Sequence, residues 1–159
     1  DRIAVMSDGV IEQVADGKTI YDLPATAFVA SFVGENNPFP GKVIKADKAG
    51  AVVETAFGRL RGVNTQGLKV GDNAILFVRP ESLQLNKGEA DATLASKVTN
   101  VAFEGNVSHV FMAGTAKKEI AITVGRHGGA VIPEQGSKLA VSYDPRYAVA
   151  LPEGKTARE

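Results

Sequence analysis

Hydrophobic and polar positions alternate along most of the chain, and this pattern predicts short β-strands. Apolar runs bounded by Gly, Pro, Asn or Lys-rich turns lie at 41–46, 50–56, 58–63, 73–80, 82–85, 95–103, 106–113, 118–124 and 137–143. Within one of them, Ile120, Ile122 and Val124 share a face, because side chains alternate along a strand. Short strands at regular spacing predict a sandwich or small barrel, and no helix of ordinary length fits after residue 41.

The N-terminal stretch has a hairpin pattern. An apolar run at 3–6 breaks at Ser7, Asp8 and Gly9 and resumes at Val10. Asp-Gly supplies the positive φ angles that a tight turn between strands needs. We therefore expect a β-hairpin over residues 1–15.

The period of the pattern changes in the next segment. Apolar residues at 21, 25, 28, 29 and 32 fall on one face of a helix. Pro24 suits a first helical turn and Gly34 suits the position after the last one, which predicts one helix over 24–33. Phe28 and Phe32 form its apolar stripe, either as core or as an interface with a part of the molecule outside this chain.

The stretch "GENNPFPG" interrupts the periodicity with two Pro, two Gly and two Asn in eight residues. Such composition is typical of a linker, which we place at 35–40. The strand-rich part that follows contains an imperfect repeat, in which Gly71 and Gly136 are each followed nine residues later by a proline, Pro80 or Pro145. The repeat predicts two barrel-like halves, about 41–94 and 95–155.

Composition narrows the possible functions. Lys and Arg together number 18, as do Asp and Glu, so the chain lacks the basic excess typical of nucleic-acid binders. The absence of cysteine excludes disulfides and thiolate metal sites. The nearest approach to a base-stacking surface is Phe57 with Arg59 and Arg61, without further interleaving of basic and aromatic residues.

No motif for catalysis is present. The sequence lacks a Gly-x-x-x-x-Gly-Lys-Ser/Thr phosphate loop and a Gly-x-Ser-x-Gly elbow. Its two histidines, His109 and His127, have no partners at metal-ligand spacing, so a surface or half-buried role is expected for both. We therefore expect no catalytic, cofactor-binding or metal-ligating residue in this chain.

Two charged clusters remain as candidates for a site. They are Arg79-Pro80-Glu81 and Asp144-Pro145-Arg146. Either they form a ligand or partner site, or they stabilise the corners where proline ends a strand. Their equivalent places in the repeat favour the structural role.

Several stretches of the chain resemble a known protein family. "DRIAVMSDGVIEQV" and "IYDLPATAFVASFVGENN" resemble the end of the nucleotide-binding domain in ATP-binding subunits of bacterial ABC importers, and "FVGENN" is most similar to the polyamine branch. Residues 71–85 and 136–151 resemble the transport-associated OB (TOBE) regulatory domain, including its "VRPE" at 78–81 and "DP" at 144–145. One departure is Ala15-Asp16-Gly17, where the family has Thr-Pro after a Gly. Asp16 can still cap the turn there.

The resemblance implies an all-β fold of tandem OB-like small barrels (TOBE/MOP-like), preceded by a short β-hairpin and one helix. Residues 1–34 would be the tail of the ATPase domain, and 41–155 the regulatory domain. The implied role is regulation and dimerisation of an importer subunit of spermidine/putrescine type, at the cytoplasmic face of the inner membrane. Implied partners are a second copy, the membrane subunits and a regulatory protein or small ligand, but no nucleic acid. ATP and Mg would bind only to the missing ATPase domain.

Two further expectations follow. The alternative function is a small-anion or metabolite-binding module, because "NPFPGKV" at 37–43 resembles part of a molybdate-binding pattern. Against it, the carboxylate of Glu35 would repel an oxyanion.

The apolar N-terminal tail, separated from its native sheet, should pack on the barrel, swap between chains or drive a non-native dimer. Its apolar residues are Ile3, Val5, Val10, Ile11, Phe28 and Phe32.

Overall fold

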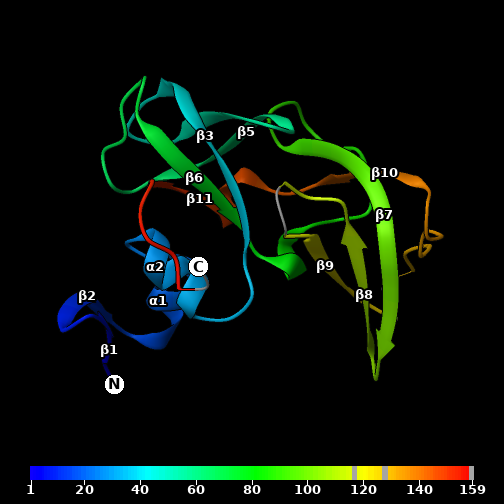
Figure 1. Ribbon diagram of the computed structural model, residues 1–159, viewed down its shortest axis with the longest axis horizontal. Helices are drawn as coiled ribbons and strands as arrows, with labels where there is room; N and C mark the ends of the chain where they lie inside the picture. The colour runs from blue at the N-terminus through cyan, green and yellow to red at the C-terminus, as the bar shows by residue number, and fades with distance from the viewer. Residues whose placement is uncertain (116–117, 127–128, 158–159) are drawn as a thin grey trace.

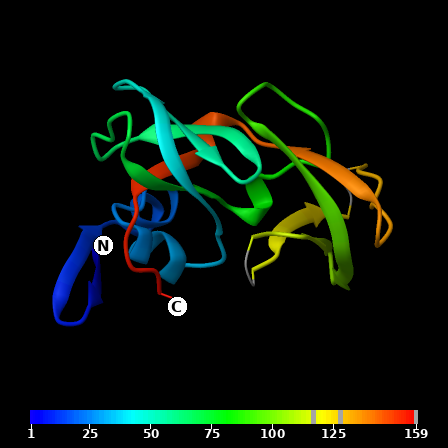
Figure 2. The ribbon, with the colours of Figure 1, turned by 45° about the horizontal axis from the view of Figure 1, so that its top comes forward.

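A closed barrel, an open sheet beside it and a small N-terminal arm make up the chain (Figure 1). The computed structural model describes residues 1–115, 118–126 and 129–157. The arm and the open sheet lie on different sides of the barrel, and the C-terminal segment returns to the arm (Figure 2). No helix among the described residues is long and apolar enough to cross a membrane.

The barrel has five strands. They are β3 (Asn37–Ala46), β4 (Ala51–Thr55), β5 (Gly58–Asn64), β6 (Asn73–Val78) and β11 (Ala148–Pro152). β11 closes the barrel because it runs antiparallel to β6 and parallel to β5. Phe39, Val53, Leu60 and Leu76 are fully buried in its interior. The alternation seen in the sequence thus places one face of each strand in the core.

The open sheet has four strands in the order β10-β7-β8-β9. Their bounds are β7 (Thr93–Glu104), β8 (Val107–Met112), β9 (Ile120–Gly125) and β10 (Lys138–Ser142). Val110, Met112, Ile120 and Ile122 are buried in one core cluster that continues into the barrel. The predicted all-β class of paired small barrels is confirmed, with the second unit an open half-barrel.

The internal repeat is visible in the backbone. Gly71 and Gly136 have φ angles of 97° and 91°, so each turn before a repeat strand adopts a conformation that favours glycine. Pro80 and Pro145 then each begin a 3₁₀ turn, η1 (Pro80–Ser82) and η2 (Pro145–Tyr147). As expected, proline ends the strand because it has no N–H for the ladder.

The two repeats exchange their last segments. β11, from the second repeat, pairs with β6 of the first, while Gln84, after η1, exchanges backbone hydrogen bonds of 2.7 and 3.0 Å with Ser142 of β10. Strand pairing therefore does not follow the predicted division at 94/95. The predicted strand at 82–85 is wrong, because η1 occupies its start and only an isolated bridge follows.

Two further elements differ from expectation. The sequence pattern did not predict β11, because its apolar run is short and follows a proline turn. β3 begins at Asn37, inside the predicted linker. Prolines 38 and 40 are tolerated there because β4 pairs with β3 only from Gly41 onward, so the prolines lie where one strand edge is free.

The arm, residues 1–35, contains the expected hairpin, β1 (Ile3–Ser7) and β2 (Val10–Ala15), followed by two short helices, α1 (Gly17–Asp22) and α2 (Ala27–Phe32). The helix predicted over 24–33 is present as α2, and a second helix, α1, precedes it, because there are two N-caps. Asp16 accepts a hydrogen bond from Thr19 N, and Thr26 accepts one from Val29 N. Pro24 lies between the helices rather than in a first turn.

Candidate functional site

Arg79 joins the arm to the barrel. It follows β6 directly, and its guanidinium is buried, with only 6% of the residue exposed. Its Nη1 donates to Val33 O (2.6 Å) and Glu35 O (2.8 Å), and its Nη2 donates to Tyr21 O (3.0 Å). One side chain thus binds the ends of both α1 and α2 and the segment that leads into β3.

Tyr21 and Glu81 complete this joint. The Tyr21 ring lies under the guanidinium, 3.9 Å from Arg79 Cζ to the ring centroid, which is cation–π geometry. The Tyr21 hydroxyl donates to Glu81 Oε2. Burial, and then the hydrogen bond to Glu81, raises the pKa of Tyr21 to about 12. Burial lowers the pKa of Arg79.

Close approach of the backbone makes the joint possible. Gly34 has a φ of 70°, and a Cβ there would lie 3.2 Å from Tyr21 Cε1 and 3.4 Å from Arg79 Nη1. The sequence singled out Arg79, Pro80 and Glu81 as a corner, and the structure places that corner against the arm. The sequence pattern placed Tyr21 only on an apolar helix face, and its part in this joint was missed. The one sequence signal was its hydroxyl, because a buried tyrosine hydroxyl usually has a hydrogen-bond partner.

The second corner has a different environment. Asp144 accepts a hydrogen bond from Arg146 N (3.0 Å), and its carboxylate also pairs with the guanidinium of Arg146 at 2.6 Å. The side chain of Arg146 is 80% exposed, so this pair contributes little to stability. Asp144 and Pro145 therefore shape a surface turn, and the structure does not bring them together with Arg79.

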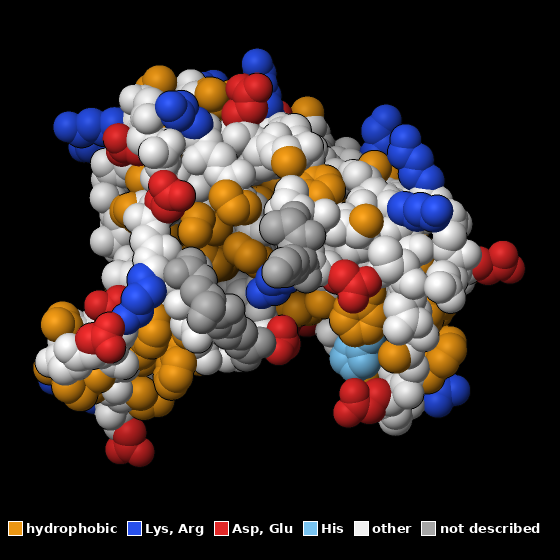
Figure 3. All heavy atoms as spheres, in the orientation of Figure 1, with side chains coloured by type: hydrophobic (Ala, Val, Ile, Leu, Met, Phe, Trp, Pro, Cys, Tyr) orange, Lys and Arg blue, Asp and Glu red, His pale blue; other side chains and the backbone are white. Residues whose placement is uncertain are grey.

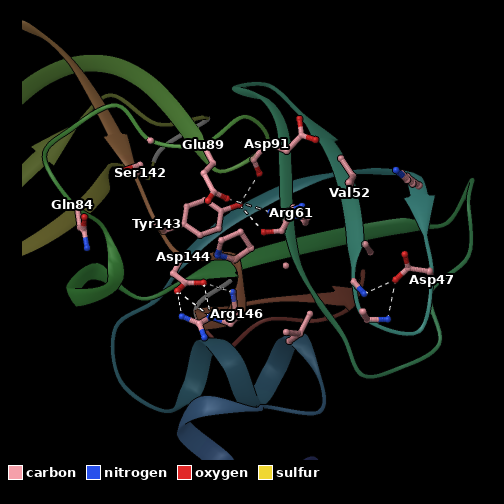
Figure 4. Close-up of a pocket in the computed structure, with 18 of the residues that line it drawn as sticks. Asp47, Val52, Arg61, Gln84, Glu89, Asp91, Ser142, Tyr143, Asp144 and Arg146 are labelled. Carbon is pink, nitrogen blue, oxygen red and sulfur yellow. Dashed lines mark hydrogen bonds and ion pairs between the residues drawn. The ribbon is translucent and has the colours of Figure 1, made fainter.

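This second corner lies on a cleft of about 840 Å³ between the barrel and the loop that precedes β7 (Figure 4). Tyr143 lies in its wall and donates to Arg61 O at 2.8 Å, and burial raises its pKa. Arg61 and Glu89 face each other across the cleft at 3.6 Å. The charged residues that line the cleft are four of each sign: Lys45, Arg61, Lys87, Arg146, Asp47, Glu89, Asp91 and Asp144. The cleft therefore offers mixed rather than single-sign charge.

The two phenylalanines of the arm differ in exposure. Their rings stack with centroids 5.5 Å apart. Phe28 packs against the arm's own core, while Phe32 is 56% exposed. Hydrophobic side chains gather on the face of the arm seen in Figure 3. The other large exposed hydrophobics of the arm are Ile3, Met6, Val10, Ile11, Val14 and Leu23.

Asn37 was missed by the sequence reasoning. Its side chain is buried, donates to Ala121 O (2.8 Å) and accepts from Ala121 N (2.9 Å). The amide thus pairs with the free edge of β9 as another strand would. Two consecutive asparagines in a proline-rich segment were the only sequence signal.

The histidines provide no metal site among the described residues. His109 Nε2 lies 3.1 Å from Glu104 Oε2, and its Nδ1 lies 3.3 Å from Thr123 Oγ1. In the part of the chain that the structure describes, no three His, Cys, Asp or Glu side chains group as metal ligands would. His127 lies outside the described residues.

Comparison with known proteins agrees with this architecture. Residues 76–151 match the TOBE domain, which is not a catalytic ATPase domain. A spermidine/putrescine import ATP-binding protein PotA of Rubrobacter xylanophilus is 37% identical over 157 residues, covering 95% of this chain and 41% of the relative. The protein of that name from Frankia alni is 30% identical over 167 residues, covering 96% of this chain and 36% of the relative.

A solved structure shows the same fold. The cytoplasmic molybdate-binding protein ModG matches with a TM-score of 0.59 and 17% identity, covering 73% of this chain and 96% of ModG. The chain spans about two fifths of the length of the curated relatives it matches. Residues 76–151 are a TOBE domain, and the chain as a whole is homologous to the C-terminal part of the ATP-binding subunits of ABC importers.

Proposed function

We propose that this chain is the regulatory and dimerising part of the ATP-binding subunit of a bacterial ABC importer of the spermidine/putrescine type. The observation that carries the proposal is similarity to PotA proteins along both the arm and the barrel, which Arg79 joins into one body. On this proposal the arm is the last part of an ATPase domain, and the barrel is the regulatory domain that follows it.

The proposed mechanism is a shift between two arrangements. Two ATPase subunits close on ATP while their regulatory domains stay in contact across the two-fold axis. A regulatory protein or ligand that binds the barrel could act only by favouring the open or the closed arrangement. ATP and Mg belong to the ATPase domain, and the membrane subunits place the assembly at the cytoplasmic face of the inner membrane.

A chimera tests the proposal directly. This chain would replace the corresponding part of the Rubrobacter relative, and the chimera would be reconstituted with that importer's membrane subunits. We expect ATP-dependent uptake of labelled spermidine to be retained. A chimera that assembles and hydrolyses ATP but does not transport spermidine would count against the proposed importer type.

The dimer needs a separate measurement, light scattering of this chain over a range of concentrations. We expect a dimer that persists in Val10→Lys combined with Ile11→Lys, which removes two exposed hydrophobics from the hairpin. These substitutions are better than deletion of residues 1–34, because deletion would uncover Ile75 and Phe77. A dimer lost in the lysine variant would mean that the apolar arm, not the regulatory domain, made it.

The cleft supports a second candidate function, a module that binds a small anion or metabolite. Its volume of about 840 Å³ suits such a ligand, and Arg61 and Arg146 could bind an anionic group. Calorimetric titration with molybdate, sulfate and spermidine, in the wild type and in Arg61→Ala, tests it. Saturable binding that is lost in Arg61→Ala would favour this function, and no heat from any of the three would reject it for these ligands.

A further inference from the structure

The arm has a hydrophobic core of its own. Val5, Ile20 and Val29 are buried together, and Phe28 and Val33 pack against them. All of these residues lie within 1–35. Among the described residues, the large core cluster of the barrel and half-barrel contains none from this range. The arm is therefore organised as a small packing unit beside the barrel rather than as a layer of its core.

The apolar contact between the two units pairs small side chains with large ones. On the arm side, Ala27 and Ala30 belong to the cluster, and on the barrel side its members are Ile75, Phe77, Val149 and Leu151. These four barrel side chains are at most 6% exposed, so docking buries apolar area and favours the docked arm. Polar contacts across the same interface then add hydrogen bonds from a charged group.

Most of those polar contacts centre on Arg79. Its three bonds reach carbonyl oxygens at the end of α1, just after α2 and in the segment before β3. Other links also hold the arm. Lys155 Nζ pairs with Asp8 Oδ2 at 2.5 Å on the surface, Ala157 N donates to Ser31 Oγ at 2.7 Å, and the buried Asn36 Nδ2 donates to Ala30 O at 3.1 Å.

We propose that Arg79, with Tyr21 and Glu81, is a latch that holds the arm on the barrel, and that the arm undocks as one unit when the latch opens. The arm keeps its own core in the undocked state, while the ends of the short helices α1 and α2 lose their bonds to Arg79 and should exchange hydrogen faster. Undocking breaks three hydrogen bonds from a charged donor, and such bonds stabilise more than neutral ones, so loss of Arg79 should shift the arm toward the undocked state.

The internal repeat supports this assignment. Aligned on the two prolines, Arg79 and Glu81 correspond to Asp144 and Arg146, so the charges are inverted. At the second corner these two charges pair with each other. At the first corner, Arg79 instead turns to the carbonyls of the arm. The second corner forms its turn without an arginine that bonds to the arm. The bonds of Arg79 to the arm therefore indicate a role beyond forming the turn.

The consequence for transport rests on the proposed function. If the arm is the end of an ATPase domain, the latch is the joint through which the barrel and that domain move together. While the latch is closed, a movement of the ATPase domain also moves the barrel. When the latch is open, the two move independently. The test of the latch itself needs no importer and no ATP.

Spin labels can measure the docking of the arm directly, because the chain has no cysteine of its own. Labels at Val10→Cys on the hairpin and Val70→Cys on a barrel loop would occupy positions that are 59% and 65% exposed. We expect one narrow distance distribution in the otherwise unchanged chain and a second, broader population in Arg79→Met. Hydrogen exchange of α1 and α2 should accelerate by about tenfold or more in this variant, while β4 and β5 stay protected.

Arg61→Met is the matched control, since the side chain of Arg61 pairs with Glu89 across the cleft rather than with the arm. We expect it to leave the distance distribution and the exchange of α1 and α2 unchanged. An unchanged distribution in Arg79→Met would overturn the latch. So would equal loss of protection in β4, β5 and the arm, because Arg79 would then stabilise the whole fold.

If Arg79→Met gives no folded protein, Tyr21→Phe carries the test. This variant keeps the ring under the guanidinium and removes only the hydroxyl that bonds to Glu81. We expect a smaller change in the same direction, in both the spin-label distances and the exchange of α1 and α2. No change in either measurement would overturn the proposal.

Discussion

Single buried polar residues decide how the parts of this molecule meet. Arg79 is charged and buried, yet its hydrogen-bond partners are main-chain carbonyls rather than a carboxylate. Asn37 is neutral and buried, and its amide bonds to both backbone groups of Ala121. Each has partners for its polar atoms, as burial requires. Neither could be exchanged for an apolar residue without leaving backbone groups of another element unpaired.

Tyr21 should make the stability of the chain depend on pH in the alkaline range. Its pKa is raised from the ordinary 10.0 to about 12 in the folded protein, so its contribution is complete below pH 10 and is lost as the pH rises toward 12. We expect the stability advantage of the wild type over Tyr21→Phe to shrink across this window. Thermal unfolding of both proteins at several pH values measures it.

Comparison with Tyr21→Phe removes the contributions of other groups that titrate in the same range. Tyr143, whose pKa is also raised by burial, is present in both proteins. A stability difference that stays constant from pH 9 to about 12 would contradict the assigned role of the Tyr21 hydroxyl.

Asn37→Ala should destabilise the chain by about 1–3 kcal/mol, because both backbone groups of Ala121 lose their partner. Urea unfolding measures the loss, and hydrogen exchange should locate it in β9. Asn100→Ala is the control, since Asn100 is exposed and, within the described part of the chain, its side chain accepts only from the neighbouring Val101 N. We expect that control to change stability by less than about 0.5 kcal/mol. Equal losses in the two variants would show that the pairing of Asn37 with β9 contributes nothing.

At the scale of the elements, both local sequence signals and tertiary contacts determine where strands and turns begin and end. The Asp-Gly hairpin turn and the two proline turns form where their residue types require them. The start of β3 instead follows from its pairing with β6, which overrides a segment composed like a linker. Element boundaries therefore depend on the neighbouring strand as well as on local preference.

Gly41 shows how tightly the barrel strands approach each other. A Cβ at this position would lie 2.1 Å from Glu54 O of the paired strand, and backbone cannot easily move away. We expect Gly41→Ala to destabilise the barrel by about 1–3 kcal/mol in urea unfolding. Gly125→Ala is the control, because a Cβ there meets none of the described residues within 4 Å. Should Gly41→Ala prove as stable as Gly125→Ala, the close approach of β3 and β4 would be refuted.

In the whole molecule, the exchanged segments make the two repeats depend on each other. β11 closes the barrel formed by the first repeat, and Gln84 of the first repeat pairs with the second. One continuous apolar cluster spans both. The two units therefore share a core rather than stacking as separate domains.

Chains split at 94/95 should consequently fail to fold alone. Residues 1–94 lack β11, so β5 and β6 would keep unpaired edges and an open core. We expect far-ultraviolet circular dichroism without a stable β signal for either fragment, and recovery of the signal when the two are coexpressed. Independent cooperative unfolding of residues 1–94 would contradict this dependence.

Much of the fold followed from residue patterns alone. Strand alternation, the Asp-Gly turn and the Gly-to-Pro repeat predicted an all-β protein of paired small barrels, because these signals act between neighbouring residues. The corner at Arg79 to Glu81 was also identified from its place in the repeat. The predicted linker and the strand at 82–85 were less accurate, since β3 pairs with β6 and Gln84 pairs with Ser142, which are distant in sequence. The additional helix α1 was missed although its N-cap, Asp16, is a local signal.

The sequence by itself determined which segments could become strands and where turns would interrupt them, since side-chain periodicity and backbone preference are local. Only the tertiary structure decided that β11 crosses to the other repeat, that Asn37 pairs with an edge strand and that Arg79 reaches the arm. The physical reason is that strand pairing and buried hydrogen bonds join residues far apart along the chain. Hydrogen-bond partners for buried polar groups are available only after the chain has folded around them.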